Sequence, residues 1–503
     1  MAELHRNYVI DILIMFSGAG HIWAVIHFAA LSGLSLYGIH RLWLLFCWHR
    51  QCGTNISMPP EGLLFRDRLM PFVTVQLPLY NERFVAGRLI DAVAEFRWPK
   101  DRLEIQVLDD SVDDTQDIVD ERINYWRKEG IDIKALRRGQ REGYKAGALN
   151  YGLSHAKGEF IAIFDADFLP PREFLLRAMP CFSDRQVGMV QARWGFLNSE
   201  HSLLTGVQSL LLGPHFDIEH RVRFRRGLFF NFNGTAGIWR RKAIETAGGW
   251  EADTVTEDLD LSYRAQLAGW RFIYLDDLTV PSELPLTMAS FRGQQQRWAK
   301  GSIQTAKKVL PRLLASPLPL AVKAESLAHL LANFGWLLGA VVTLTLFPTI
   351  TWRVGIGPYQ LMRVDLPLFM GTSFAIFLYF FIYKIKQNGQ VPFVWLLLLP
   401  VISIGMAPGI ALSVLKGIFS RGGVFERTPK FGIRGRNALP GLAFLYRQQA
   451  SPYLMINLLL FAYSIMPIMF AWQRETWLAI PFLTIFPVGF CFVIFKDLSE
   501  IRR

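Results

Sequence analysis

The sequence predicts an α/β domain with a mainly parallel sheet, joined to an α-helical transmembrane domain. The chain has 503 residues, 51% of them hydrophobic, and its mean hydropathy of +0.23 is high for a soluble enzyme. Long apolar runs occupy residues 1–50 and the part of the chain after residue 327. Between them, short apolar stretches alternate with stretches of helical period, which is typical of βα units.

The first part of the chain, residues 1–50, is predicted to anchor the protein in a membrane. The clearest span is Trp23–Trp48, whereas Tyr8–Phe16 fits either an interfacial segment or part of a second span. Basic residues that follow, such as Arg66 and Arg68, place the next region on the cytoplasmic side.

Residues 51–284 are predicted to form the α/β domain. Apolar stretches of strand length alternate here with stretches of helical period, and the most apolar strand comes last. The expected strands are Phe72–Leu77, Leu103–Leu108 and Phe160–Phe164, and the expected helices are Arg83–Phe96 and Thr115–Lys128.

The remaining part is predicted to be helical and membrane-associated. Residues 285–326 combine aromatic side chains with Lys307 and Lys308, a pattern that predicts amphipathic helices in the membrane interface. Residues 327–503 hold apolar runs of about 20 residues, the length that crosses a bilayer. The expected limits of these runs are Ala328–Ile350, Leu366–Tyr383, Pro392–Leu415, Tyr453–Ala471 and Trp477–Phe495.

The formal net charge of +12 allows two interpretations. One is binding to nucleic acid, and the other is contact with anionic lipids on the cytoplasmic face of a bilayer. Lys and Arg cluster beside the apolar runs, for example at Lys384 and Lys386. We therefore expect a lipid bilayer as a partner and no nucleic acid.

The loop of residues 416–450 creates a conflict in this topology. It carries seven basic residues against one acid, so it is predicted to be cytoplasmic. Three simple crossings before it would place it outside. Because the run 392–415 contains Pro400 and Pro408, we expect it to lie in the interface or to turn back, beside protein or water.

Two acids follow the most apolar strand directly. Asp165 and Asp167 stand where α/β sheets place their ligands, at the carboxyl end of a strand. Mg²⁺ or Mn²⁺ prefers such oxygen ligands and is commonly shared with substrate phosphates. The pattern Asp-x-Asp is common, so two solvated loop acids are the alternative.

Three further residues are candidates for substrate binding at neighbouring strand ends. Glu82 and Asp110 follow the first two strands and are expected to hydrogen-bond a nucleoside, although either residue fits equally well at the start of a helix. Lys145 begins another predicted helix and fits a phosphate or a base, or a plain surface lysine.

The string Thr256-Glu257-Asp258 precedes an amphipathic stretch. A carboxylate here could take a proton from an attacking hydroxyl as a general base, and Asp258 is the candidate. Thr256 and Glu257 are expected to contact the substrate. The alternative is helix capping by Thr256 or Asp258.

The string from Gln294 to Trp298 lies just before the membrane helices. Arg297 can donate two parallel hydrogen bonds to a diphosphate, Trp298 offers a face for a sugar ring, and Gln294 adds a polar contact. Trp and Arg also occur on ordinary interfacial helices, which is the competing interpretation.

Taken in order, these motifs resemble those of processive family 2 glycosyltransferases, which include the cellulose synthases and, more closely, the cellulose-synthase-like glucan and mannan synthases. The resemblance implies a GT-A-type nucleotide-sugar domain in the cytoplasm and a transmembrane channel. It assigns Asp110 to the nucleotide, Asp165 and Asp167 to a metal-bound diphosphate, and Asp258 to the base. It also places Arg297 at the diphosphate.

The resemblance extends to residues 425–430, which are similar to the family's gating-loop motif Phe-x-Val-Thr-x-Lys. Thr428 and Lys430 match this motif, and Arg427 stands where the family has Val. Together with Trp298, which the resemblance puts under the acceptor sugar, this motif predicts processive synthesis coupled to translocation.

We therefore expect a multi-pass membrane enzyme, in the plasma or inner membrane if bacterial, that extends a β-linked glycan with inversion from UDP-glucose or GDP-mannose. Its expected partners are the nucleotide-sugar donor and the growing glycan, with accessory proteins or further copies of the chain as candidates. Two alternatives are the transfer of one sugar to a lipid, such as ceramide or a polyprenyl phosphate, and a transporter with a regulatory nucleotide-binding domain.

Overall fold

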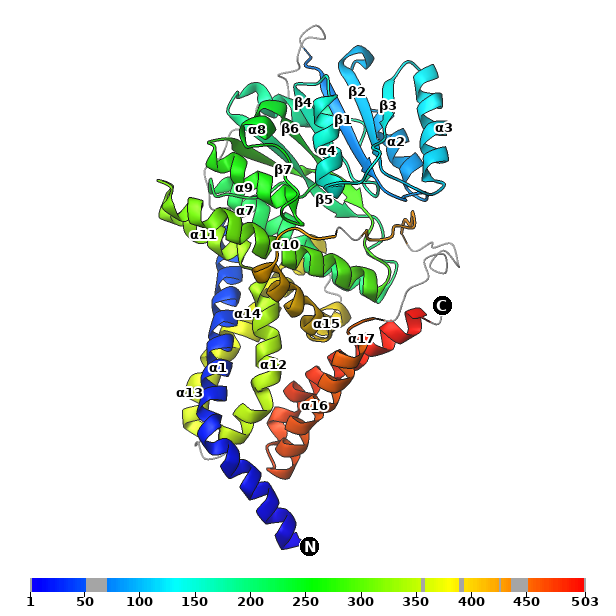
Figure 1. The fold of residues 1–503 in the computed structure, drawn as a ribbon. Helices are drawn as coiled ribbons and strands as arrows, with labels where there is room; N and C mark the ends of the chain where they lie inside the picture. Colours follow the sequence, from blue (N-terminus) through cyan, green and yellow to red (C-terminus); the bar gives the residue numbers. More distant parts are fainter. Residues whose placement is uncertain are drawn as a thin grey trace. The chain divides into compact units, whose positions relative to one another are not determined.

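The computed structural model describes residues 2–50, 70–353, 358–388, 393–424, 427–435 and 451–501, with side chains from residue 21 onward except at 358–362 and 388 (Figure 1). The chain divides into two compact units. The sheet unit comprises residues 47–331 and 417–446, and the helical unit comprises residues 1–46, 332–416 and 447–503.

The sheet unit is built on one seven-stranded mixed sheet with the order β3-β2-β1-β4-β6-β5-β7. Strands β1 to β4 are parallel neighbours, β5 is parallel to β7, and β6 runs antiparallel to both β4 and β5. The predicted mainly parallel sheet is thus confirmed. The strands are β1 (Val73–Leu79), β2 (Leu103–Asp109), β3 (Asp132–Leu136), β4 (Phe160–Ile163), β5 (Val187–Phe196), β6 (Gly237–Arg240) and β7 (Arg271–Ser282).

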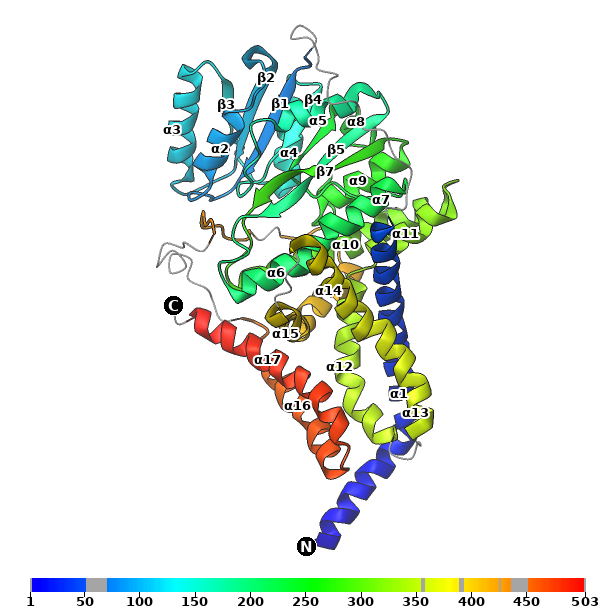
Figure 2. The same ribbon diagram turned by 180° about the vertical axis from the view of Figure 1, so that it is seen from behind.

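Helices cover both faces of this sheet, which are seen from opposite sides in Figures 1 and 2. One face packs against α2 (Ala86–Ala94), α3 (Thr115–Lys128) and α5 (Phe174–Ala178). The other packs against α4 (Tyr144–Ser154), α8 (Arg241–Thr246) and α9 (Glu257–Leu267). Because both faces are covered, the polar side chains that alternate with apolar ones in β1 and β2 are buried as well, and they pair across the two strands: Thr74 donates to Glu104 at 2.7 Å and Gln76 donates to Gln106 at 3.1 Å.

Further helices extend the sheet unit beyond the sheet. Tyr263 of α9 packs with residues of α10 and α11 in a separate small core, so part of the stretch predicted to be interfacial is buried against the sheet unit. The elements are α6 (Leu203–Pro214), the π-helical turn His215–His220, α7 (Arg221–Arg225), α10 (Met288–Ala315) and α11 (Leu320–Leu330). The 3₁₀ turns are Lys100–Arg102 and Met179–Ser183.

A buried arginine ties α11 to the rest of the sheet unit. The side chain of Arg223 in α7 is 1% exposed and donates to Glu219 at 3.1 Å and to Glu325 of α11 at 2.9 Å. Loss of Glu325 would remove one of these two buried contacts and leave Glu219 as the remaining carboxylate at this guanidinium among the described residues.

Glu325→Gln is therefore expected to destabilise the sheet unit by about 2 kcal/mol, the typical contribution of a hydrogen bond to a charged group. The measurement is the midpoint of thermal unfolding of the purified protein, followed by circular dichroism. The control is Glu121→Gln, because Glu121 is an exposed residue of α3. Equal midpoints for the two variants would contradict a stabilising role for this buried network.

Six described helices of the chain are long and apolar enough to cross a membrane, as expected for an integral membrane protein. The candidate spans are His21–His49, Phe334–Trp352, Arg363–Gln387, Phe393–Phe419, Leu454–Gln473 and Trp477–Ile501. They lie in α1 (Ala2–His49), α12 (Phe334–Trp352), α13 (Pro358–Phe369), the π-helical turn Met370–Phe374, α14 (Ala375–Asn388), α15 (Phe393–Phe419), α16 (Leu454–Gln473), the 3₁₀ turn Trp477–Ala479 and α17 (Ile480–Ile501).

Two of these helices bear on the predictions for the membrane region. Helix α1 is continuous, so the stretch 8–16 extends the helix of the first span rather than forming a separate one. Helix α15 is also continuous, so the expectation that the run 392–415 turns back is wrong. The alternative that this run lies in the interface stays a prediction, as does the cytoplasmic side of the loop 416–450.

Candidate active site

The carboxyl ends of β1, β2 and β4 open into a cleft of the sheet unit. Because these three strands are parallel neighbours, the residues that follow them meet at one edge of the sheet. The cleft has a volume of about 170 Å³. Every candidate residue predicted from the sequence lines it: Glu82, Asp110, Lys145, Asp165, Asp167, Thr256, Glu257, Asp258, Gln294, Arg297 and Trp298.

Asp165 is held by a lysine and by the turn that precedes β6. Lys145 of α4 donates to Asp165 at 2.6 Å and to the carbonyl of Gly234 at 2.9 Å, so it is not a plain surface lysine. The amide of Asp165 donates to Thr235 Oγ1 at 2.8 Å. Burial raises the pKa of Asp165, and the ammonium group of Lys145 opposes this rise.

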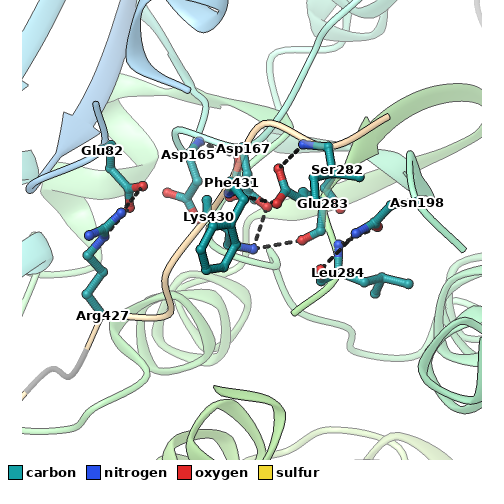
Figure 3. Close-up of polar contacts among 12 residues, drawn as sticks. Glu82, Asp165, Asp167, Asn198, Ser282, Glu283, Leu284, Arg427, Lys430 and Phe431 are labelled. Atoms are coloured by element: carbon teal, nitrogen blue, oxygen red, sulfur yellow. Dashed lines mark hydrogen bonds and ion pairs between the residues drawn. The ribbon is translucent and has the colours of Figure 1, made fainter. Parts of the chain in front are cut away.

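Asp167 and Glu82 contact residues from the far end of the chain (Figure 3). Lys430 Nζ lies 2.7 Å from Asp167 Oδ2, and Arg427 donates two hydrogen bonds to Glu82, at 3.0 and 2.7 Å. Burial raises the pKa of Glu82 to about 7, although the guanidinium of Arg427 acts in the opposite direction. The residue that departs from the gating-loop motif therefore forms an ion pair inside the cleft.

Asp110 is oriented by an arginine and does not cap a helix. Arg138 donates through Nε and Nη2 to its two carboxylate oxygens, the first contact at 3.0 Å. The residue before α3 is Asp114. Beside it, the guanidinium of Arg141 lies 3.5 Å from the ring centroid of Tyr80, and its buried Nε has no hydrogen-bond partner among the described residues.

Asp258 lies in the first turn of α9, facing the turn that contains Gly234. Its Oδ1 accepts a hydrogen bond from the amide of Leu259 at 2.8 Å. Gly234 has φ +81°, and a Cβ added there would lie 2.9 Å from Asp258 Oδ2, so glycine is required. Burial, followed by the neighbouring Glu257 carboxyl, raises the pKa of Asp258 to about 7.

Helix α10 contributes the last motif. Arg297 lies close enough to Glu257, Asp165 and Asp258 to interact with them electrostatically. Gln294 Oε1 is buried and accepts no hydrogen bond from the part of the chain that the structure describes. Trp298 also lines the cleft. The cleft thus joins carboxylates, a guanidinium and a flat aromatic surface.

Residues 71–301 match the family model described as "Glycosyltransferase like family 2". This domain belongs to glycosyltransferase family 2. The predicted resemblance is therefore confirmed, and the cleft is that of a glycosyltransferase domain.

Relatives of the family 2 domain include plant proteins. The chain is 47% identical over 249 residues to glucomannan 4-beta-mannosyltransferase 2 of Arabidopsis thaliana, covering 48% of this chain and 47% of the relative. It is 42% identical over 269 residues to glucomannan 4-beta-mannosyltransferase 1 of Oryza sativa subsp. japonica, covering 52% and 51%. The chain spans about half the length of the curated relatives it matches.

Among solved structures, a mannosyltransferase from Pyrobaculum calidifontis in complex with GDP-Man and Mn²⁺ has a similar fold. The TM-score is 0.54 and the sequence identity is 20%, over 79% of this chain and 99% of that one. The similarity agrees with the GT-A-type fold predicted for the family 2 domain.

The donor set of the family 2 domain fits a divalent cation. Asp165 and Asp167 present carboxylate oxygens in the cleft, and each already attracts the ammonium group of a lysine. Mg²⁺ and Mn²⁺ prefer such oxygen ligands. A second acidic group, Glu251, Asp253 and Asp260, is bridged by Lys308 at 2.6, 2.8 and 3.1 Å, so its charge is offset by the chain itself.

Several residues of the cleft were not predicted from the sequence. Arg141 belongs to no motif and follows β3, and the same holds for Arg138, which does not line the cleft but orients Asp110. Glu283 was also missed, although it lies directly before the predicted interfacial stretch. Only Lys430 had a signal, through its place in the gating-loop motif.

The motif Thr256-Glu257-Asp258 contacts the helix that carries the Gln294–Trp298 motif, and a glycine lies at the contact. Gly301 of α10 is buried against Thr256, and a Cβ at Gly301 would lie 2.9 Å from Thr256 Cβ and closer still to the end of that side chain. The hydroxyl oxygens of Thr256 and of Thr305 in α10 lie 3.3 Å apart. The side chain of Thr256 does not cap α9.

Gly301→Ala is therefore expected to push α10 away from Thr256 and to lower kcat/KM on the order of tenfold, equivalent to about 1.4 kcal/mol. The control is Gly293→Ala on the same helix, where an added Cβ meets nothing within 4 Å. Initial rates with radiolabelled donor measure both variants. Equal rates would show that the contact does not position the motif on α10.

Proposed function

We propose that this chain is a metal-dependent, inverting mannosyltransferase of the membrane, which transfers mannose from GDP-mannose to a growing β-linked mannan or glucomannan. One observation carries the proposal: four motifs that lie far apart in the sequence, contributed by β2, β4, α9 and α10, line one cleft. The mannosyltransferases among the plant relatives support mannose as the sugar.

In the proposed reaction, Asp258 accepts the proton of the acceptor hydroxyl as its oxygen attacks the anomeric carbon. Attack opposite to the leaving nucleoside diphosphate converts an α-linked donor into a β-linked product. Arg297 stabilises the charge on the leaving diphosphate by hydrogen bonding. A divalent cation held by Asp165 and Asp167 would supply further charge stabilisation there.

The proposed acceptor contacts lie on α10. Trp298 offers an aromatic face to a sugar ring, and Gln294 Oε1, which accepts no hydrogen bond from the described residues, can accept one from a sugar hydroxyl. Holding the acceptor hydroxyl next to Asp258 would turn the proton transfer into an intramolecular step.

The proposed base pocket lies at Tyr80, Asp110 and Arg141. The Nε of Arg141, which has no hydrogen-bond partner among the described residues and belongs to a guanidinium over the ring of Tyr80, can donate to an acceptor atom on a base edge. Arginine pairs well with guanine because O6 and N7 are two adjacent acceptors, whereas uracil offers no such pair. This geometry favours GDP-mannose over UDP-glucose.

The protein is proposed to be oriented with the sheet unit in the cytoplasm. The support is the excess of Lys and Arg next to the apolar runs, which marks the cytoplasmic side of membrane proteins. Transport of the product through the helical unit is part of the same proposal, because it would bring the polymer across the bilayer.

A donor screen tests this function. The purified protein in lipid nanodiscs would receive radiolabelled GDP-mannose or UDP-glucose, with Mn²⁺ and a short β-1,4-mannan acceptor. We expect incorporation from GDP-mannose into a polymer that an endo-β-mannanase digests. A product that partitions into organic solvent would indicate a lipid acceptor, and addition of one sugar per acceptor would exclude processive synthesis.

A further inference from the structure

A segment near the end of the sheet unit, residues 427–433, crosses the candidate active site (Figure 3). We call it the strap. Its second half is fixed through Glu283, whose carboxylate accepts hydrogen bonds from the amides of Phe431 at 2.8 Å, Gly432 at 2.9 Å and Ile433 at 3.2 Å. Glu283, Phe431 and Ile433 are buried, so this half is anchored by packing and by backbone contacts.

The first half of the strap is held in a different way, by two cationic side chains. Lys430 Nζ donates to Asp167 Oδ2 at 2.7 Å and to the carbonyl of Glu283 at 2.8 Å. Arg427 pairs with Glu82. The side chains of Lys430 and Asp167 are each 10% exposed, so their charges are shielded from water and interact strongly.

The ammonium group of Lys430 contacts Asp167 Oδ2, one of the two oxygens through which this carboxylate could bind a metal ion. A divalent ion bound to this carboxylate would lie only a few ångströms from the ammonium nitrogen, where two positive charges repel each other. Lys430 lies on a stretch without regular structure, next to Pro429, so its side chain can leave Asp167 while Phe431 and Ile433 stay in place.

We infer that Lys430 is the exchangeable counter-ion of Asp167: it holds the carboxylate while the divalent cation is absent, and the cation displaces it on binding. The inference rests on the metal site of the proposed function. Metal binding and the position of the strap are then reciprocally linked. The metal ion and the ammonium group of Lys430 compete for one carboxylate, so each weakens the binding of the other.

Mn²⁺ binding without donor tests this exchange. The full-length protein in nanodiscs would be titrated with Mn²⁺, and free Mn²⁺ would be measured by electron paramagnetic resonance. Lys430→Gln is expected to lower the Kd for Mn²⁺ about tenfold, equivalent to about 1.4 kcal/mol, which is the effect if Lys430 occupies Asp167 about nine-tenths of the time.

The matched control is Arg427→Gln, which removes the other ion pair of the strap and leaves the hydrogen bond between Lys430 and Asp167 in place. Its Kd is expected to change less than about twofold. A Kd for Lys430→Gln equal to or above that of the wild-type protein would overturn the exchange.

A second readout uses the wild-type protein and does not depend on folding of a variant. Acetylation of Lys430 by acetic anhydride, followed by mass spectrometry, reports whether its amine is free. Saturating Mn²⁺ is expected to speed this acetylation about tenfold, and Lys100 provides an exposed reference. An unchanged rate at Lys430 would contradict the displacement.

The metal site of the proposed function and the exchange at Lys430 can be told apart by experiment. If Asp167→Asn does not weaken Mn²⁺ binding, the metal site of the proposed function is wrong, and the exchange is wrong with it. If Asp167→Asn abolishes binding while Lys430→Gln leaves the Kd unchanged, the metal site stands and only the exchange is refuted.

Discussion

Asp258→Asn is expected to lower the turnover number more than about 100-fold, because the asparagine side chain cannot accept the proton of the attacking hydroxyl. Binding of GDP should change little, because Asp258 is proposed to contact the acceptor hydroxyl and not the nucleotide. Radiometric turnover and calorimetric titration with GDP measure the two effects.

The control for this variant is Asp117→Asn, at an exposed position of α3. It should retain full activity. Retention of activity by Asp258→Asn would remove the general base from the mechanism and would favour the transporter interpretation, in which the acid has no catalytic role.

The pH dependence follows from the same residue. A general base acts only when it is deprotonated, and the pKa of Asp258 is raised to about 7. The protonated, inactive form is therefore dominant at pH 6, and kcat/KM should rise as the pH increases through about 7. Initial rates between pH 5.5 and 8.5 at limiting donor, in buffers matched to about 0.15 M ionic strength, measure this limb. A flat profile would assign the proton transfer to another group.

Removal of the divalent cation is expected to have the second large effect. Chelation with EDTA should reduce turnover on the order of 100-fold, because the charge that develops on the diphosphate loses several kcal/mol of stabilisation. Added Mn²⁺ or Mg²⁺ should restore activity in the wild-type protein. The measurement is radiometric turnover across a titration of free metal.

The variants Asp165→Asn and Asp167→Asn test whether these two residues hold the cation. Both variants should resist rescue by metal, whereas Asp253→Asn, in the group bridged by Lys308, should behave as the wild-type protein does. Full activity after chelation would show that turnover does not need a chelatable cation and that other groups stabilise the charge on the diphosphate.

Much of the fold could be predicted because it depends on local patterns. The predicted helix Thr115–Lys128 has the bounds of α3 in the structure, since both its apolar period and its flanking acids are visible in the sequence. The site residues were predicted for a related reason. Parallel strands bring their carboxyl ends to one edge, so acids after β1, β2 and β4 meet whatever the loops do.

The contacts made by the strap could not be predicted in this way. Lys430 and Asp167 are separated by 263 positions, and Arg427 and Glu82 by 345. No periodicity links such distant segments, and the departure of Arg427 from the family motif gave no indication that it would pair with Glu82. Tertiary packing decides these contacts.

The expectation that the run 392–415 turns back was wrong for a different reason. Pro400 and Pro408 suggested a break, but each proline removes only local hydrogen bonds, and α15 continues through both. Gly405 packs so closely against the Gly489 carbonyl of α17 that no side chain fits there, so its role is close helix packing. The glycine and proline residues of this run thus occur in a continuous, closely packed helix, and the sequence alone did not distinguish that case from a turn.

The pairing of Arg223 with Glu325 has a practical consequence for shortening the chain. A truncation after residue 301, where the family match stops, would delete Glu325 and leave Glu219 as the described carboxylate that still pairs with the buried guanidinium. A truncation after residue 331 would keep Glu325 but would remove residues 417–446, which belong to the sheet unit and include the strap. A shortened protein should therefore retain both ranges of the sheet unit to stay monodisperse.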